Sequence, residues 1–324
     1  MKIGIVGATG LVGQKLLTLL ENSLLPIDEL RLIASQRSLG KKLPYRGKEV
    51  DVIPLSDRVF ASLNLVFFMA TKDVAKKYAP LAIKNNCVVI DNSSYFRLNP
   101  EVPLIVPEVN IASIKNEHAL IANPNCSTIQ LVVCLNALAK INPIKRVEVA
   151  TYQAVSGAGR KAIEELKSKI RDYNNKIVFN AVPHIDDFDK SGYTKEELKV
   201  IFETQKILNQ EFPISCTAVR IPVINGHSES ISITFENEVN ILSVHQIFKN
   251  SENIIVIDDI ENNKYPLVED CQGRQEVFVG RIRKDFSNPN ILHLWCVADN
   301  LVKGAAANAL QIAEKCFKQK IFGW

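Results

Sequence analysis

The amino-acid sequence predicts an α/β protein with two domains, a doubly wound parallel sheet and an α+β domain with a mixed sheet. Its 324 residues exceed the ~150 that one core usually carries. The first 125 residues alternate short, nearly continuous apolar runs with helical patterns, which is typical of strands buried on both faces of a parallel sheet. After Cys126 the strands become longer and alternate polar with apolar residues, which favours a sheet with one covered face.

Each expected element follows from a local pattern of apolar residues. Short apolar runs predict buried strands in the first domain, at residues 2–6, 30–34, 65–70, 88–90 and 120–122. Apolar residues at helical spacing predict helices there, most clearly at residues 12–20 and 74–84. After Cys126 the patterns predict strands at residues 146–155, 215–223, 230–235 and 292–297, and helices at residues 128–140, about 158–174 and 195–209. A closing helix is predicted at residues 301–317.

Composition and charge exclude several classes of protein. Hydrophobic residues make up 47% and charged residues 23%, which is a globular composition. No apolar stretch approaches the ~20 residues that span a bilayer, and the chain starts directly with a strand pattern, so we expect no membrane segment, no signal peptide and a cytoplasmic location. The net charge is +4 without a Lys/Arg run, which gives nucleic-acid binding little support. Seven cysteines without paired short spacing argue against a disulfide framework or a zinc ribbon, and no metal is expected.

A glycine-rich segment at residues 7–13 predicts a dinucleotide site. Its Gly-x-x-Gly-x-x-Gly spacing follows the first predicted strand and opens a helix, so the backbone can turn tightly and approach a pyrophosphate at the positive helix N-terminus. This context indicates a Rossmann-like domain. The expected cofactor-binding residues of this loop are Gly7, Thr9, Gly10, Leu11 and Val12.

The end of the second predicted strand favours NADP over NAD. NAD sites usually place an acidic residue there against the ribose hydroxyl, whereas this chain has Arg37 between serines and no acid. The Arg37 guanidinium would neutralise a 2′-phosphate, aided by the hydroxyl of Ser35 or Ser38. The alternative is an ordinary solvated arginine.

Cys126 is the candidate nucleophile. It follows the last predicted strand of the first domain and precedes a helix, which is where ligands bind in such folds and where a helix N-terminus favours a thiolate. The alternative is a small buried core residue, and that is how we interpret Cys134, Cys216, Cys296 and Cys316.

Two further residues stand out in the second domain. His227 lies in a polar turn between strands and could serve as the proton partner of the thiol. Arg220 interrupts an otherwise apolar strand, so it needs an anion, either a structural carboxylate or the carboxylate of a substrate. Periodicity does not separate these two possibilities.

Five segments together resemble a known family. They are GATGLVG at residues 7–13, NPNCST at 123–128, QAVSGAG at 153–159, RIPV at 220–223 with GHSE at 226–229, and ADNL at 298–301. In this order and over essentially the full length, the chain closely resembles the aspartate-β-semialdehyde dehydrogenases. The resemblance implies NADPH-dependent reductive dephosphorylation of aspartyl phosphate to aspartate semialdehyde, within lysine and diaminopimelate, threonine, methionine and isoleucine biosynthesis.

The resemblance also implies catalytic roles. Cys126 would attack the acyl carbon, expel phosphate and form a thioester, and His227 would act as general acid/base. Gln153 matches the residue that orients the substrate, Arg220 the one that binds the α-carboxylate, and Asn125 belongs with the substrate-binding residues. The expected cofactor contacts near the nicotinamide are Ser156, Gly157 and Asn300.

The predicted helix at residues 195–209 carries charged residues with two interpretations. Thr194 and Glu197 have capping-box spacing, which gives Glu197 a structural role. The resemblance assigns Glu196 to the substrate amino group and Lys199 to phosphate, whereas the residues alone would suggest a solvated charged face. The apolar stripe expected on this helix comprises Leu198, Ile201, Phe202 and Leu208.

Arg97, after a strand end, matches the second phosphate ligand of the family. The implied domains are residues 1–127 with 300–324 for NADP binding and 128–299 for catalysis and dimerisation, in a homodimer or a tetramer. The segment Cys271 to Glu276 receives no role: its thiol is either exposed and oxidisable or part of a structural loop.

Three other functions compete with this interpretation. An N-acetyl-γ-glutamyl-phosphate reductase shares the thioester chemistry, but its acylated substrate has no use for Glu196 facing an ammonium group. A non-catalytic NADP-binding sensor would be expected to lose Cys126 or His227, and this chain has both. A cysteine hydrolase would leave the glycine loop and Arg37 without a purpose.

Overall fold

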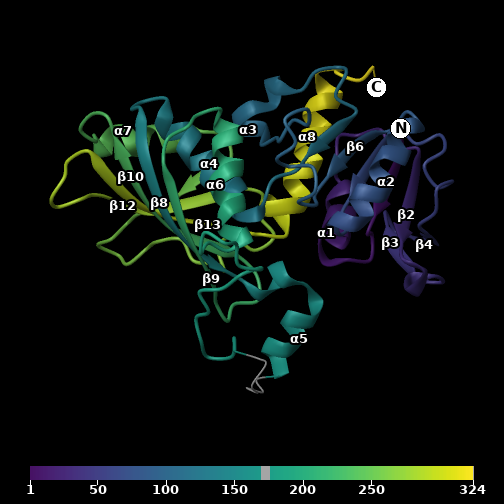
Figure 1. The fold of residues 1–324 in the computed structure, drawn as a ribbon, viewed down its shortest axis with the longest axis horizontal. Coiled ribbons are helices and arrows are strands. Elements are labelled where there is room, and N and C mark those ends of the chain that lie inside the picture. The colour runs from purple at the N-terminus through teal and green to yellow at the C-terminus, as the bar shows by residue number, and fades with distance from the viewer. Residues whose placement is uncertain (169–175, 324) are drawn as a thin grey trace. The chain divides into compact units, whose positions relative to one another are not determined.

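The computed structural model describes residues 1–168 and 176–323. The chain divides into two compact units, each of which is described by itself: unit 1 comprises Met1–Asn125 with Ala305–Trp324, and unit 2 comprises Cys126–Gly304. Figure 1 traces both along the chain. Within the described ranges, no helix combines the length and the apolar character that crossing a membrane requires.

Unit 1 contains a seven-stranded sheet in the order β3-β4-β2-β1-β5-β6-β7. The strands β1 to β7 are, in chain order, Lys2–Val6, Glu29–Ala34, Lys42–Tyr45, Lys48–Pro54, Leu65–Phe68, Val88–Asp91 and Leu120–Ala122. All neighbours pair in parallel except β3 and β4. This confirms the predicted doubly wound sheet. The β3–β4 hairpin was not predicted, because most of its residues are exposed and an edge hairpin needs no continuous apolar run.

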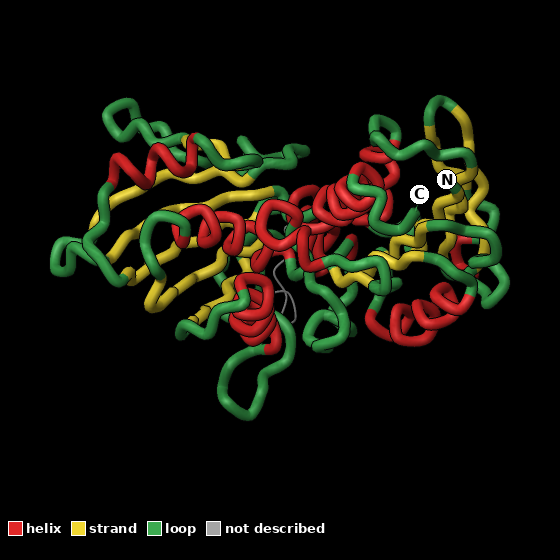
Figure 2. The backbone as a smooth tube through the Cα atoms, turned by 90° about the horizontal axis from the view of Figure 1, so that it is seen from above, coloured by secondary structure: helices red, strands yellow, loops and turns green. Residues whose placement is uncertain are grey.

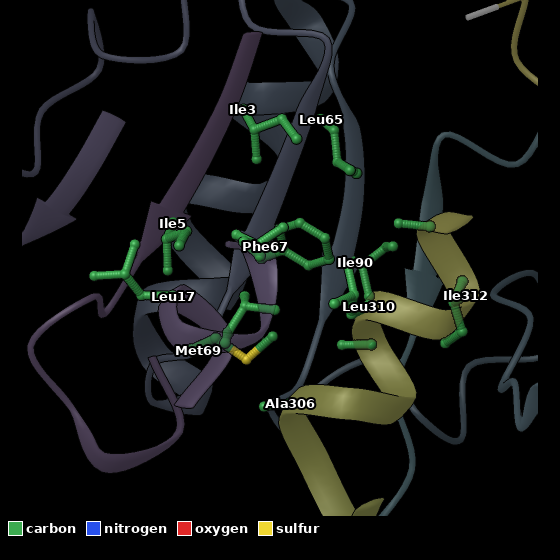
Figure 3. Packing of buried hydrophobic residues seen from close by; sticks show 14 of the residues in the cluster. Ile3, Ile5, Leu17, Leu65, Phe67, Met69, Ile90, Ala306, Leu310 and Ile312 are labelled. Carbon is green, nitrogen blue, oxygen red and sulfur yellow. The ribbon is translucent and has the colours of Figure 1, made fainter. Parts of the chain in front are cut away.

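Helices α1 (Leu11–Leu20), α2 (Lys72–Lys84), α3 (Pro107–Asn110) and α8 (Ala307–Lys318) belong to unit 1. One core cluster joins the strand side chains Ile5 and Phe67 to Leu310 and Ile312 of α8, and all four are at most 4% exposed (Figure 3). This packing brings the C-terminal helix back to the N-terminal sheet.

Unit 2 contains a six-stranded sheet in the order β11-β12-β13-β10-β8-β9. Its strands β8 to β13 are, in chain order, Ile144–Gln153, Ile214–Arg220, His227–Phe235, Ile254–Val256, Val277–Lys284 and Ile291–Ala298. Pairing is antiparallel in the centre and parallel at both edges, so the predicted mixed sheet is confirmed. Figure 2 shows these strands lying side by side. Strands β11 and β12 were not predicted from the sequence.

Three helices pack on one face of this sheet: α4 (Cys126–Ala139), α6 (Lys195–Leu208) and α7 (Ile241–Lys249) (Figure 1). Almost every residue of α4 is buried, which confirms the predicted buried helix and fixes Cys126 as its first residue. Helix α5 (Arg160–Ser168) covers the described part of the helix expected near 158–174, and residues 169–174 of that prediction lie outside the described residues. Helix α7 was not predicted.

Two predicted details are corrected. The expected helix 301–317 starts with a π-helical turn, Val302–Ala306, because the Gly304 N–H donates to the Asp299 carbonyl five residues back. The predicted apolar stripe of α6 is wrong at Phe202, which is 46% exposed, whereas Ile201 is buried. The buried face of α6 instead includes the polar side chains Glu196 and Thr204. This face of the helix packs against α4 and β9, and Glu196 on it belongs to the candidate site.

Candidate active site

The glycine loop of unit 1 is built from close backbone approaches. Gly7 has φ +87°, and a Cβ placed on it would lie 2.2 Å from the Met69 carbonyl oxygen. A Cβ on Gly13 would lie 2.2 Å from the Gly7 carbonyl oxygen. Gly10 is the N-cap of α1 and supplies no side-chain cap. The first N–H groups of α1 therefore have no partner within the helix and can bind an anion.

The end of β2 is joined to this loop. The hydroxyls of Thr9 and Ser38 are hydrogen-bonded at 3.2 Å, and Ser38 is buried. Ser35 and Arg37 beside it are exposed. The exposed Arg37 guanidinium is compatible with both of its interpretations, a phosphate ligand and a solvated side chain.

The half-buried thiol of Cys126 interacts electrostatically with the guanidinium of Arg220 in unit 2. The Arg220 guanidinium lies at the end of β9, and its Nη1 donates to the Ala154 carbonyl at 2.7 Å. Burial lowers the pKa of Arg220, and the charges of Cys126 and Glu196 offset part of this effect. Arg220 therefore lies near the thiol of Cys126 and the carboxylate of Glu196, and both its charge and the N-terminus of α4 would stabilise negative charge that develops on the sulfur.

His227 begins β10 and is fully buried. Its Nδ1 accepts a hydrogen bond from the Ala154 N–H at 3.1 Å, while its buried Nε2 has no hydrogen-bond partner among the described residues. Burial, followed by the charge of Arg220, lowers the pKa of His227 to about 3. The ring is therefore neutral near pH 7, and because Nδ1 accepts, its proton resides on Nε2.

Gly157 allows the His227 ring and the Arg220 guanidinium to approach each other. A Cβ on Gly157 would lie 3.1 Å from Nη1 of Arg220 and 3.5 Å from Nε2 of His227. The glycine is exposed, although both side chains beside it are mostly or fully buried. A side chain at this position would crowd both groups.

Glu196 links the remaining polar groups of unit 2. Its side chain is 6% exposed, accepts from Gln153 Nε2 at 3.2 Å and pairs with Lys199 Nζ at 3.1 Å. Lys199 also pairs with Asp186 at 2.7 Å. Burial lowers the pKa of Lys199, but Glu196 and Asp186 outweigh it and the net pKa is raised. Glu196 and Gln153 are buried and Lys199 is half-buried, so Glu196 does not belong to a solvated charged face, although Asp186 is exposed. Glu197 closes the predicted capping box with Thr194.

The structure brings together most of the residues that were predicted for chemistry. Unit 2 gathers Cys126, Gln153, Glu196, Lys199, Arg220 and His227. Unit 1 holds Asn125, which is 6% exposed, and Arg97, which is 7% exposed and donates to the Asn92 carbonyl at 2.8 Å. Ser156 and Asn300 bond each other at 2.9 Å and are almost fully buried.

Several polar residues of the site region were not anticipated. Asp186 lies 13 positions before its partner Lys199, and no local pattern predicts that pairing. Glu229 is 0% exposed on β10, two residues after His227, and burial raises its pKa well above the ordinary value. Asp299 is also completely buried. A signal for Glu229 and Asp299 existed, since both lie within segments that carry the family resemblance, GHSE at residues 226–229 and ADNL at 298–301.

Both parts of the chain match family profiles. Residues 2–117 match "Semialdehyde dehydrogenase, NAD binding domain", and residues 135–303 match "Semialdehyde dehydrogenase, dimerisation domain". The chain is 49% identical to the aspartate-semialdehyde dehydrogenase of Aquifex aeolicus, with 98% of each chain covered.

Solved structures agree with these matches. Aspartate semialdehyde dehydrogenase II of Vibrio cholerae, complexed with ASA, is 39% identical with a TM-score of 0.93 and 98% of each chain covered. Aspartate semialdehyde dehydrogenase of Candida albicans, solved with NADP, is 27% identical with a TM-score of 0.79 and 99% of each chain covered.

Proposed function

The chain belongs to the aspartate-semialdehyde dehydrogenase family, and we propose that it reversibly reduces L-aspartyl-4-phosphate to L-aspartate-4-semialdehyde with NADPH. The product feeds lysine, threonine, methionine and isoleucine biosynthesis in this proposal. The observation that carries the mechanism is the cluster of Cys126, Arg220, His227 and Glu196 in unit 2. These residues supply, in that order, a nucleophile, an anion-binding group, an imidazole that can donate a hydrogen bond, and a carboxylate.

Cys126 performs the covalent step. Its thiolate attacks the acyl carbon of the mixed anhydride, and the tetrahedral species expels phosphate to leave a thioester. The nicotinamide cofactor, when bound, supplies the hydride that reduces this acyl carbon. The sulfur then leaves as the carbonyl forms, which releases the aldehyde and restores the thiolate. The reverse reaction follows the same path and consumes phosphate.

His227 acts from its neutral form. Nε2 carries the proton, so the ring can donate a hydrogen bond to the oxygen that becomes negative when the acyl carbon turns tetrahedral. The Ala154 N–H keeps Nδ1 as an acceptor and so holds this tautomer. The proton stays on Nε2 throughout, and the hydrogen bond weakens again as the carbonyl re-forms.

The charged residues orient the substrate. The half-buried Arg220 would bind the α-carboxylate with a bidentate fork, and Glu196 would receive the α-ammonium group while Gln153 fixes the acyl group beside the thiol. Asn125 directly precedes Cys126 in the sequence, and we assign it to substrate binding as well. A carboxylate beside a guanidinium suits an amino acid with a free amine, which favours this substrate over an N-acetylated one.

Phosphate binding falls to two cations. We assign Arg97 and Lys199 to the transferring phosphoryl group, whose developing charge they would stabilise. Lys199 pairs with Asp186 and Glu196 in this structure, so the substrate phosphate would compete with Asp186 for the ammonium group.

The cofactor is proposed to be NADP. The loop residues Gly7, Thr9, Gly10, Leu11 and Val12 fit a pyrophosphate, because the uncapped α1 N-terminus offers backbone donors without a side chain in the way. Arg37, with Ser35 and Ser38, would bind the 2′-phosphate. Ser156, Gly157 and Asn300 would contact the nicotinamide end.

We propose a homodimer formed through unit 2, whose family profile names a dimerisation domain. The sheet face opposite α4 is only partly buried and carries Tyr152 and Trp295, whose rings lie 5.4 Å apart. Aromatic residues on a half-covered sheet face are typical of protein interfaces. Residues 1–127 with 300–324 remain the proposed NADP-binding domain, and 128–299 the catalytic one.

The test is phosphate-dependent reduction of NADP by the purified protein. L-aspartate-4-semialdehyde and N-acetylglutamate-5-semialdehyde are offered in parallel, with NAD as the control cofactor. We expect turnover of the first alone, and only with phosphate present. Turnover of the second alone would overturn the roles of Glu196 and Arg220, and NADP binding without turnover of either would support a sensor.

A further inference from the structure

Asp299 is a buried carboxylate to which the mechanism above assigns no role. It follows β13 directly and is 0% exposed. Its Oδ1 accepts the backbone N–H groups of Leu301 and Val302 at 2.9 and 3.0 Å. Its Oδ2 accepts Asn225 Nδ2 and the Gly273 N–H, both at 2.8 Å. Four donors thus converge on two oxygens, and they come from three separate segments of unit 2.

The first segment supports the nucleophile. By capping residues 301 and 302, Asp299 starts the π-helical turn, and its own carbonyl accepts the Gly304 N–H at 2.9 Å. A Cβ on Gly304 would lie 2.8 Å from Cβ and 3.2 Å from Cα of Cys126. The bare backbone of Gly304 therefore packs directly against the nucleophile, and a displaced turn would displace the thiol.

The second segment supports the histidine. Asn225 is two residues before His227, and its amide is held by Oδ2 of Asp299. The neighbouring Asn300 accepts the Gly226 N–H at 2.9 Å, so consecutive residues of one motif bind consecutive residues of the turn. This turn leads directly into β10, where His227 is the first residue.

The third segment packs against the same turn. Gly226 has φ +96°, and a Cβ on it would lie 2.9 Å from Val268 Cβ and 3.2 Å from Cys271 Sγ. Cys271 is 0% exposed in a small apolar cluster, and Gly273 two residues later donates to Asp299. The segment from Cys271 to Glu276, which had no role from sequence, is thus a structural loop behind the His227 turn.

We propose that Asp299 is a positioning residue that keeps the side chains of Cys126 and His227 in their positions relative to each other. This inference rests on the proposed roles of those two residues. A carboxylate is required because all four partners are donors. An asparagine would direct its NH₂ group at two of them and leave buried N–H groups unpaired. Loss of the carboxylate would then move the turn beside Cys126, the turn before His227, or both.

The experiment compares Asp299→Asn with Asp285→Asn. Asp285 is the matched control, because it also caps a turn, accepting the Ser287 and Asn288 N–H groups at 2.8 and 3.1 Å, but it precedes the opposite end of β13. We expect kcat for semialdehyde oxidation to fall about 100-fold in Asp299→Asn, since a misplacement near 1 Å costs about that much, with KM little changed. Asp285→Asn should retain the wild-type kcat.

A second readout needs neither substrate nor cofactor. The rate at which iodoacetamide alkylates Cys126, followed by mass spectrometry of its peptide, should fall in Asp299→Asn and stay at the wild-type value in Asp285→Asn. Wild-type kcat and alkylation rate in folded Asp299→Asn would overturn the proposal. Turnover by Cys126→Ala would instead overturn the proposed function itself, so the two failures are distinguishable.

Two further variants keep the proposal testable if Asp299→Asn does not fold. Asn225→Ala removes the hydrogen bond between Asp299 and the turn before His227, together with the bond that Asn225 Oδ1 accepts from Ser156 at 3.3 Å, and leaves the turn beside Cys126 in place. We expect a lower kcat with unchanged alkylation of Cys126. Gly304→Ala crowds the nucleophile alone, and we expect both quantities to fall. If Asn225→Ala and Gly304→Ala changed kcat and the alkylation rate of Cys126 in the same way, Asp299 would not support the two turns separately.

Discussion

The two units build their binding sites from different parts of the chain. In unit 1 the functional groups are backbone N–H groups, and the glycines serve by lacking side chains, as Gly7 and Gly13 do at 2.2 Å from carbonyl oxygens. In unit 2 the functional groups are side chains that are mostly buried and held by other side chains, such as Glu196 by Gln153 and Lys199.

This difference teaches which substitutions each site tolerates. A backbone site loses function when atoms are added, because the added Cβ displaces the main chain. A side-chain site loses function when a polar atom is removed, because its buried partners lose their hydrogen bonds. Substitutions in either unit test this contrast, and their expected effects range from large to small.

Removing the sulfur of Cys126 should have the largest effect. We expect Cys126→Ala to lower kcat by about 10⁴-fold or more, since loss of a nucleophile removes the covalent path. The affinity for NADPH should stay close to wild type, because Cys126 is not among the proposed cofactor contacts. Stopped-flow absorbance measures turnover, and quenching of protein fluorescence measures NADPH binding. A comparable loss of turnover and of NADPH affinity would contradict the idea that the two units carry different functional groups.

Adding a methyl group to Gly13 should weaken NADPH binding, the property that Cys126→Ala leaves unchanged. In Gly13→Ala the Cβ meets the Gly7 carbonyl, the loop must shift, and we expect NADPH to bind at least about tenfold more weakly, or about 1.4 kcal/mol. The control is Gly40→Ala, which has φ +80° but no atom within 4 Å of the added Cβ. That variant should lose only about 1 kcal/mol of unfolding free energy. Equal NADPH affinity in both variants would contradict a backbone-built site.

Arg37 is the exception in unit 1, because it would contribute a charged side chain. We expect Arg37→Ala to reduce the preference of kcat/KM for NADP over NAD by about tenfold, the effect of losing a charge-assisted hydrogen bond. Arg58→Ala, which removes another exposed arginine of unit 1, should leave the ratio unchanged. An unchanged ratio in both variants would return Arg37 to an ordinary solvated side chain.

The smallest expected effect concerns Glu229. Because burial raises its pKa, the folded chain keeps a proton that the unfolded chain releases above the ordinary carboxyl pKa, so this group lowers the unfolding free energy as pH rises. In Glu229→Gln this dependence disappears, and the variant should gain stability relative to wild type between about pH 5 and pH 8. Urea unfolding of both proteins across this range measures it. A difference between the two that stays constant with pH would show that the carboxylate is ionised in the folded chain.

Much of the architecture was readable from local sequence. The central strands, the glycine loop and the position of Cys126 at a helix start depend on neighbouring residues, so their patterns predict them. The edge hairpin β3–β4 and the strands β11 and β12 escaped, because short or exposed strands carry weak alternation.

The side-chain network was less predictable because its partners are distant in sequence. Asp299 and Asn225 are separated by 74 positions, and the pair of Gln153 with Glu196 by 43. A helical pattern also placed Phe202 on the buried face of α6, whereas that face carries acids for the site. Folding brings such residues together, and no local rule anticipates their bonds.

The neutral ring of His227 has a consequence for the number of protons that substrate binding takes up or releases. With a pKa of about 3, the ring has no proton to gain or lose across the physiological range. Substrate binding should therefore exchange no proton between this histidine and the buffer. Binding enthalpies measured in buffers of different ionisation heat should then contain no contribution from this ring. The histidine offers the same hydrogen-bond donor throughout that range.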